Sequence, residues 1–191
     1  RPAGVGAKEG EAMSELERDL GLLLEAAAGK PPAAQREHVL EALSSTLSKA
    51  FSLRPDELAI LVLNRERTML QFVYPFELAE GGRNTFPLTI PSLASRVIQT
   101  GRSVLMNAMR DVPHLGIYER IRIQETVPRD IQKLLAVAVK SPDGKPQAVI
   151  EISRRGKGPA EAGPDFRPED QQLLERLASA AAPVMIQAFA G

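Results

Sequence analysis

The chain has 191 residues, of which 43% are hydrophobic and 25% charged, enough apolar material for one domain with its own core. Its 24 basic and 24 acidic residues cancel, so net charge gives no attraction to nucleic acid or to an anionic membrane. The lack of cysteine excludes disulfides, thiolate metal sites, a cysteine nucleophile and thioether-linked chromophores. No stretch approaches the roughly 20 apolar residues of a membrane helix, and residues 1–7 lack the apolar core of a signal peptide. We therefore expect a cytoplasmic protein with neither a membrane nor a nucleic-acid partner.

The N-terminal part of the chain predicts a flexible lead-in over residues 1–10 and a separate helix within residues 11–32. The Gly-Lys-Pro-Pro run at 29–32 ends that helix. Because a lone helix of this length is only marginally stable, its apolar stripe must pack against the rest of the monomer or against a second copy. The stripe alternates spacings of three and four residues and consists of Met13, Leu16, Leu20, Leu23 and Ala27.

Residues 33–191 predict a single domain of mixed helices and strands. A second helix runs over 33–53, with His38 at the edge of its apolar face. Apolar runs bounded by turn residues predict strands at 58–63, 68–76, 84–90, 103–107, 131–139 and 147–153.

Two further helices and one long connection complete the domain. Ser92 and Gly101 suit the N-cap and the C-terminal stop of a short helix between them. Residues 108–129 form a connection of a length typical of a functional lid or a mobile loop. The closing helix begins near 166–170, and Pro183 is expected to kink or end it.

From about residue 33 to 189, this order of elements resembles the GAF family of small-molecule sensing and dimerisation domains. The Pro-Ser-Leu-Ala-Ser-Arg-Val-Ile-Gln-Thr-Gly-Arg-Ser-Val segment at 91–104 is similar to the family's small helix, glycine stop and following strand. The strand at 148–153 and Phe166-x-x-x-Asp170 are similar to its closing elements. The resemblance implies an α+β fold: a central antiparallel sheet of about six strands with helices on both faces, plus the added N-terminal helix.

Relatives that bind cyclic nucleotides often carry an Asn-Lys pair and a distant Phe-x-x-x-Asp-Glu. The matching positions are Ser153-Arg154 and Phe166-x-x-x-Asp170-Gln171, so only the Phe and the Asp are kept. This difference speaks against cyclic-nucleotide binding. Asp170 has two structural roles open to it, pairing with Arg154 or holding the start of the helix. We therefore assign Arg154, Phe166 and Asp170 to a structural signature.

Candidate ligand contacts cluster around the long connection. His114 is either a ligand-facing or an exposed loop histidine, and Asn107 is either a pocket residue or a turn residue. Arg120 and Arg122 project to one side if this segment is extended, and form either an anion site or a solvated charged edge. The tentative ligand-binding set is Arg96, Asn107, His114, Tyr118, Arg120 and Arg122.

We expect no catalytic residues, metal site or cofactor. Neither a Ser-His-Asp arrangement nor a phosphate-binding glycine loop stands out, and haem would have only His38 and His114 as imidazole ligands. The resemblance implies a non-enzymatic sensory module of bacterial signalling that binds a small molecule. Because members of this family pair their terminal helices, the resemblance also favours a homodimer through the helix at 11–32. The alternative is a dimerising scaffold without a functional ligand pocket.

Overall fold

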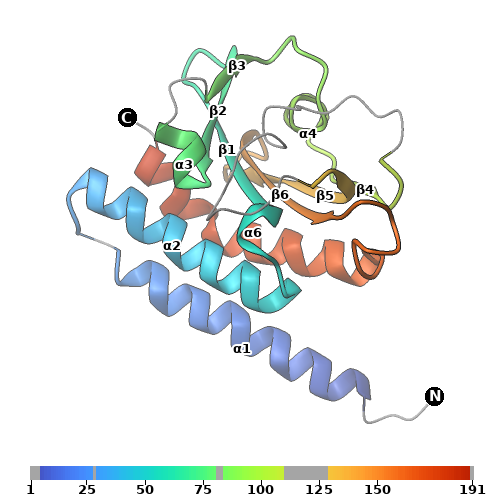
Figure 1. Ribbon diagram of the computed structural model, residues 1–191. Coiled ribbons are helices and arrows are strands. Elements are labelled where there is room, and N and C mark those ends of the chain that lie inside the picture. The colour runs from blue at the N-terminus through green and yellow to red at the C-terminus, as the bar shows by residue number, and fades with distance from the viewer. Residues whose placement is uncertain (1–4, 28, 81–83, 110–128, 190–191) are drawn as a thin grey trace.

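The computed structural model describes residues 5–27, 29–80, 84–109 and 129–189 (Figure 1). Six strands form one antiparallel sheet in the order β3-β2-β1-β6-β5-β4. The strands are β1 Leu58–Leu63, β2 Met69–Tyr74, β3 Thr85–Pro87, β4 Val104–Met106, β5 Ile131–Lys140 and β6 Pro146–Arg155. The predicted α+β fold, with a six-stranded antiparallel sheet covered on both faces, is confirmed.

Three helices cover one face of the sheet, which we call the helical face. Alternate residues of the central strands, such as Ile60, Val137 and Ile150, point into a core closed by these helices. In Figure 1, α1 is the outermost of the three and lies alongside α2. The helices are α1 Val5–Glu25, α2 Pro32–Phe51 and α6 Pro168–Phe189.

The opposite face, which we call the α4 face, carries the other set of alternate residues. Leu61, Phe72 and Ala136 pack there beneath two short helices and form a second apolar core. As predicted, Ser92 caps α4 by accepting from Ser95 N, and Gly101 ends it in the left-handed region. The helices of this face are α3 Phe76–Glu80 and α4 Leu93–Thr100, and the 3-10 turn η1 Pro55–Glu57 precedes β1.

Four expected boundaries were wrong. The strand predicted over 84–90 ends at Pro87, whose carbonyl accepts from Ile90 N in a turn. Helix α1 begins at Val5, within the predicted lead-in, because a glycine weakens a helix by only about 1 kcal/mol and does not break it. The strand predicted to reach Phe76 ends at Tyr74, since Pro75 has no N–H for the ladder and its carbonyl accepts the first bonds of α3. Of the kink or end expected at Pro183, the end is wrong, because α6 continues to Phe189 and buried Met185 and Ala188 anchor the turns that follow.

The predicted apolar stripe of α1 is divided between two environments. Leu20 and Ala27 are fully buried in the core of the single chain, together with Leu24, where α1 packs on α2 and α6. This inward face repeats at four and three residues, which the helical period dictates. Leu23 lies outside it and is 42% exposed. Leu20 and Ala27 are therefore residues of the monomer core, whereas a dimer contact through Leu16 and Leu23 stays a prediction; the Met13 side chain lies outside the described part.

Polar contacts fasten α1 to the other helices. The Arg176 guanidinium on α6 lies 2.8 Å from the Glu17 carboxylate. His38 on α2 donates from Nε2 to the Leu23 carbonyl at 2.8 Å, and its Nδ1 lies 3.1 Å from Lys30 Nζ. One ring nitrogen of His38 thus contacts α1, and the other contacts the segment that joins α1 to α2.

Candidate functional site

A column of polar side chains crosses the α4 face along central strand β6. Glu151, Ser153 and Arg155 alternate with Ile150 and Ile152, whose side chains belong to the helical face. All three polar residues are buried, Arg155 and Ser153 almost completely. Polar residues in the middle of a sheet are unusual because each must find a partner away from water.

Ser153 is the least satisfied member of this column. Its Oγ is buried and makes no hydrogen bond with any described residue. A buried hydroxyl without a partner costs free energy, so its presence calls for an explanation such as a bound group. The Ser153 hydroxyl is therefore a candidate ligand contact.

The cross-strand neighbours of Glu151 are small residues. Across the two adjacent strands, Glu151 is in register with Ala59 on β1 and with Ala136 on β5. Side chains directly opposite each other in antiparallel strands lie about 5 Å apart, and alanine fills little of that space. The two alanines thus surround the carboxylate with small side chains at the centre of the α4 face.

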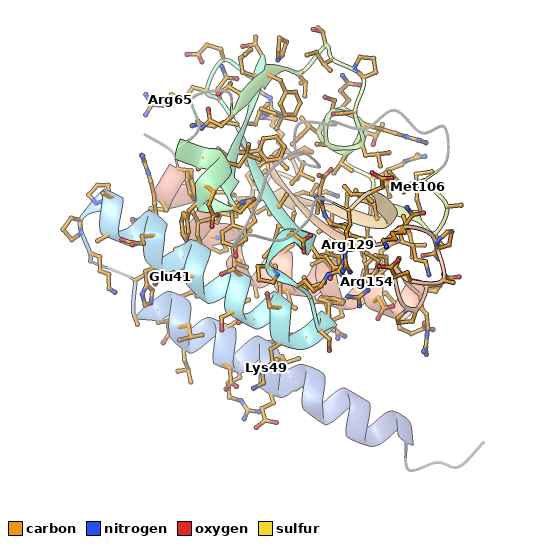
Figure 2. The ribbon with its side chains drawn as sticks, viewed as in Figure 1. Glu41, Lys49, Arg65, Met106, Arg129 and Arg154 are labelled. Atoms are coloured by element: carbon orange, nitrogen blue, oxygen red, sulfur yellow. The ribbon has the colours of Figure 1, made fainter. Side chains whose placement is uncertain are left out.

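Arg155 connects the column to a charged cluster at the start of β1. Glu57, only 3% exposed, accepts from the backbone N–H groups of Arg54 and Arg155 at 3.0 and 2.9 Å and from Arg54 Nη2 at 2.9 Å. Arg155 Nη1 donates to the Arg129 carbonyl at 3.1 Å, and its Nε lies 3.9 Å from Asp56. Figure 2 labels Arg129 and Arg154, which both belong to this end of the sheet. The cluster fixes Arg155 at the end of the column.

The three signature residues make structural contacts. Arg154 Nη2 donates to the Phe51 carbonyl at 2.7 Å, at the C-terminal end of α2, and the guanidinium lies over the Phe166 ring at 5.2 Å from its centroid. Asp170 accepts from Arg167 N at 2.7 Å and so holds the start of α6. Of the two roles open to Asp170, the structure shows the helix start.

The tentative ligand contacts are only partly described. Asn107 donates from Nδ2 to the Phe166 carbonyl and accepts from Phe166 N, both at 2.9 Å, which occupies its amide with protein partners. Arg96 is exposed on α4 and lines a shallow pocket of about 370 Å³, apart from Asn107. His114, Tyr118, Arg120 and Arg122 lie outside the described residues.

A cleft of about 530 Å³ lies at the end of the sheet, between the C-terminal end of α2 and the start of α6. Its lining has cations and anions in near balance, and those other than the Arg167 guanidinium have contacts with one another, with a neighbouring charged side chain or with the backbone. The charged lining residues are Arg54, Glu57, Arg154, Glu161, Asp165, Arg167 and Asp170. Nearby, buried Lys133 lies 2.7 Å from the Asp165 carboxylate. This arrangement serves mainly to hold the loop before α6 in place.

Sequence reasoning missed Glu151, Ser153 and Arg155 as one set. The available signal was three polar residues at spacings of two inside an apolar strand, which the period of a strand puts on one face.

Among the described residues, no group of three or more His, Asp or Glu side chains is placed to hold a metal ion. The described helices also include none that is long and apolar enough to span a membrane.

Comparison with known proteins gives the fold. No family model matches the sequence, and a search of curated proteins finds no match. Among solved structures, the chain is similar to the GAF domain of an Acinetobacter phosphoenolpyruvate-protein phosphotransferase, with 14% identity, TM-score 0.66, and 94% and 96% of the two chains covered. The corresponding domain from Coxiella burnetii matches with 13% identity, TM-score 0.67, and 93% and 95% coverage. A free methionine-R-sulfoxide reductase from Neisseria meningitidis matches with 13% identity, TM-score 0.60, and 94% and 92% coverage. At these identities the likeness concerns architecture, and the chain has the fold of GAF domains.

Proposed function

We propose that this protein is a non-catalytic sensory domain that binds a small polar molecule on the α4 face. The observation that carries the proposal is the Ser153 hydroxyl, buried near the end of strand β6 without a hydrogen-bond partner among the described residues. Glu151 on one side of it supplies a carboxylate and Arg155 on the other a guanidinium. Since residues two apart on a strand are separated by about 7 Å, a ligand with donors and acceptors at both ends matches the column.

Proteins of similar architecture support a regulatory role. They include a fragment of a methyl-accepting chemotaxis protein, with 14% identity and TM-score 0.60, and GAF domains attached to phosphotransferases. The reductase matches are enzymes. Reduction by a cysteine thiol is excluded here by the sequence, which favours sensing over that catalysis.

The signal would leave through a homodimer formed by α1. Leu22 and Leu23 are 60% and 42% exposed on the outer side of this helix, where a second copy would bury them. Helix α6 packs on β5 on one side and on α1 on the other. A shift of the sheet would therefore reach α1 through α6, as expected of a cytoplasmic bacterial signalling module.

The test is native mass spectrometry of the full chain purified from cells. We expect a dimer that carries an adduct of constant small mass. Ser153→Ala should lower the occupancy of the adduct at least about tenfold without dissociating the dimer, because a buried hydrogen bond is lost. Ser45→Ala, on the exposed side of α2, is the matched control and should keep the adduct. An adduct that S153A leaves unchanged would refute the assignment to the column.

A dimerising scaffold is the second candidate, and one observation favours it. Asn107 and Arg154 are both occupied by protein groups, which leaves fewer polar contacts for a ligand. Two results together would support this reading. The wild-type chain would be a dimer without an adduct, and the double variant Leu22→Ser, Leu23→Ser would be a folded monomer. A wild-type monomer would refute dimerisation through α1 in both proposals.

A further inference from the structure

A second pocket lies at the edge of the sheet, where short strand β4 ends beside long strand β5. The described pairs between these strands run from Met106 with Leu134 to Val104 with Ala136, so residues 137–140 of β5 have no described partner strand on that side. The loop after α4 and the middle of α6 enclose this open edge, and the pocket between them measures about 470 Å³. None of its lining residues belongs to the polar column of β6.

Two cations line this pocket, and neither is paired within the described part of the chain. The Arg102 guanidinium and the Lys140 ammonium form no hydrogen bond and no ion pair with a described residue. Lys140 is held close to the corner that ends α4, since a Cβ built on Gly101 would lie 3.9 Å from Lys140 Nζ. The donors of both side chains are therefore available to an anion in the pocket.

The wall formed by α6 supplies groups of a different kind. Gln171, Glu175 and Ser179 follow one another at spacings of four residues, which puts them on one side of the helix. Glu175 Oε1 accepts from Ser103 Oγ at 2.6 Å and from Gln171 Nε2 at 2.9 Å. The other oxygen, Oε2, forms no hydrogen bond with a described residue, and the same holds for the Ser179 hydroxyl. This wall therefore offers acceptors that match the hydroxyl groups of a ligand.

The charges of the pocket decide which anion fits it best. Arg102 and Lys140 line the same pocket as Glu175, yet neither cation forms an ion pair with that carboxylate. Two positive charges therefore face one negative charge that is held on the opposite wall by Ser103 and Gln171. A phosphate monoester carries a charge of about −1.5 to −2 at pH 7 and three acceptor oxygens, whereas a carboxylate carries a single charge. The phosphate group thus matches two cations better than a carboxylate does.

We propose that this pocket binds the phosphate monoester of a small polyhydroxy compound, such as a sugar phosphate. The phosphate accepts from Arg102 and Lys140, and hydroxyl groups of the ligand donate to Glu175 Oε2 and bind the Ser179 hydroxyl. At roughly 30 Å³ per water-sized atom, a free phosphate fills only about 150 Å³, so the pocket of about 470 Å³ has room for the attached sugar. An apolar ligand fits poorly, because Ala138 supplies the only apolar side chain of the described lining. This site is independent of the ligand proposed on the α4 face.

The test follows the backbone amide signals of Gly101, Ala138 and Lys140 by ¹H–¹⁵N NMR of the full chain. Glucose 6-phosphate and ribose 5-phosphate are the probes, and we expect saturable shifts with a dissociation constant on the order of a millimolar. Glucose and inorganic phosphate should each bind at least about tenfold more weakly, because each makes only one half of the contacts. The proposal is overturned if neither probe shifts these amides saturably, or if glucose or inorganic phosphate binds as tightly as the esters.

Paired charge variants separate this site from general attraction of anions. Arg102→Gln with Lys140→Gln should weaken both esters at least about tenfold and leave the melting temperature nearly unchanged, since neither charged group has a described partner. Lys49→Gln with Lys157→Gln removes two charges from exposed positions outside the pocket and is the matched control, which should keep the affinity. Ser153→Ala should also keep it, which distinguishes failure here from failure of the α4-face proposal. An equal loss of affinity in the two double variants, or no loss in either, would overturn the proposal.

A variant of the α6 wall tests the contacts to the hydroxyl groups. Glu175→Gln removes the negative charge and the Oε2 acceptor but keeps an oxygen for Ser103 and Gln171. It should bind inorganic phosphate more tightly than the parent chain does, and its preference for the esters over inorganic phosphate should fall. An unchanged preference would refute the role of Glu175 and with it the assignment to a polyhydroxy ester.

Discussion

Asn107 and Phe166 exchange two hydrogen bonds although they lie 59 residues apart. The Asn107 amide donates to the Phe166 carbonyl and accepts from the Phe166 N–H, both at 2.9 Å, as a neighbouring β-strand would. Asn107 follows β4 at the edge of the sheet, and Phe166 precedes α6. The pair therefore anchors the loop before α6 to the sheet edge, and Phe166 in turn supports the Arg154 guanidinium.

Replacing Asn107 with alanine should lower the free energy of unfolding by about 1–3 kcal/mol, because two partly buried backbone groups of Phe166 lose their partner. Urea denaturation followed by circular dichroism measures this change. Gln172→Ala, on the exposed side of α6, is the control and should change stability by less than about 0.5 kcal/mol. An equal effect of the two substitutions would show that the Asn107 bonds contribute nothing.

Replacing Glu57 with alanine should destabilise the fold by about 3–5 kcal/mol. The carboxylate is 3% exposed and accepts from Arg54 and from the Arg155 backbone, so its loss leaves buried donors and positive charge without compensation. Thermal unfolding of E57A and of E66A, on the exposed β1–β2 turn, gives the comparison. If E57A unfolds at the temperature of E66A, the cluster is not a stabilising element.

Ser52 and Gly101 both end helices in the left-handed region, with φ of 51° and 64°. Ser52→Gly should stabilise the protein by about 0.5–1 kcal/mol, since glycine adopts this conformation without steric cost. Gly101→Ala should destabilise it by about 1 kcal/mol, because alanine adopts this backbone conformation only with strain. The added Cβ itself would not clash, since its nearest atom lies at 3.6 Å. Chemical denaturation of the two variants should therefore give changes of opposite sign.

The turn between β5 and β6 should show an acidic titration. Hydrogen bonds from Lys145 and Ser141 lower the pKa of Asp143 from 3.8 to about 2. Because the folded pKa lies below the unfolded one, the contribution of Asp143 to stability is present above pH about 4. It is lost as the pH falls through about 2.

NMR titration of the Asp143 carboxyl carbon should give a midpoint near 2. Asp143→Asn should be less stable than the parent chain at neutral pH, and the difference should shrink as the pH falls below 4. Lys145→Gln should move the Asp143 pKa back towards 3.8. A wild-type midpoint near 4 would contradict the assigned hydrogen bonds.

Local patterns in the sequence were sufficient for much of the architecture. The strand at 58–63 and the caps of α4 at Ser92 and Gly101 follow from interactions within about four residues, which a single sequence displays. The same locality explains the errors. Whether Pro183 ends α6 depends on the burial of Met185 and Ala188 against the sheet, and α1 continues to Val5 through glycines that only weaken a helix.

The candidate sites depended on contacts that no local pattern contains. The period of a strand places Glu151, Ser153 and Arg155 on one face, but only the packed sheet shows that this face is buried and that Ser153 has no described partner.

Composition and periodicity by themselves determined that this chain lacks thiol chemistry and contains mixed helices and strands preceded by an additional N-terminal helix, and the family resemblance implied their α+β arrangement. Only the tertiary structure decided that Leu20 and Ala27 belong to the monomer core and that Asn107 binds the Phe166 backbone. The reason is physical. Helix and strand periods come from short-range backbone geometry, whereas burial and charge pairing depend on which distant segments meet when the sheet closes.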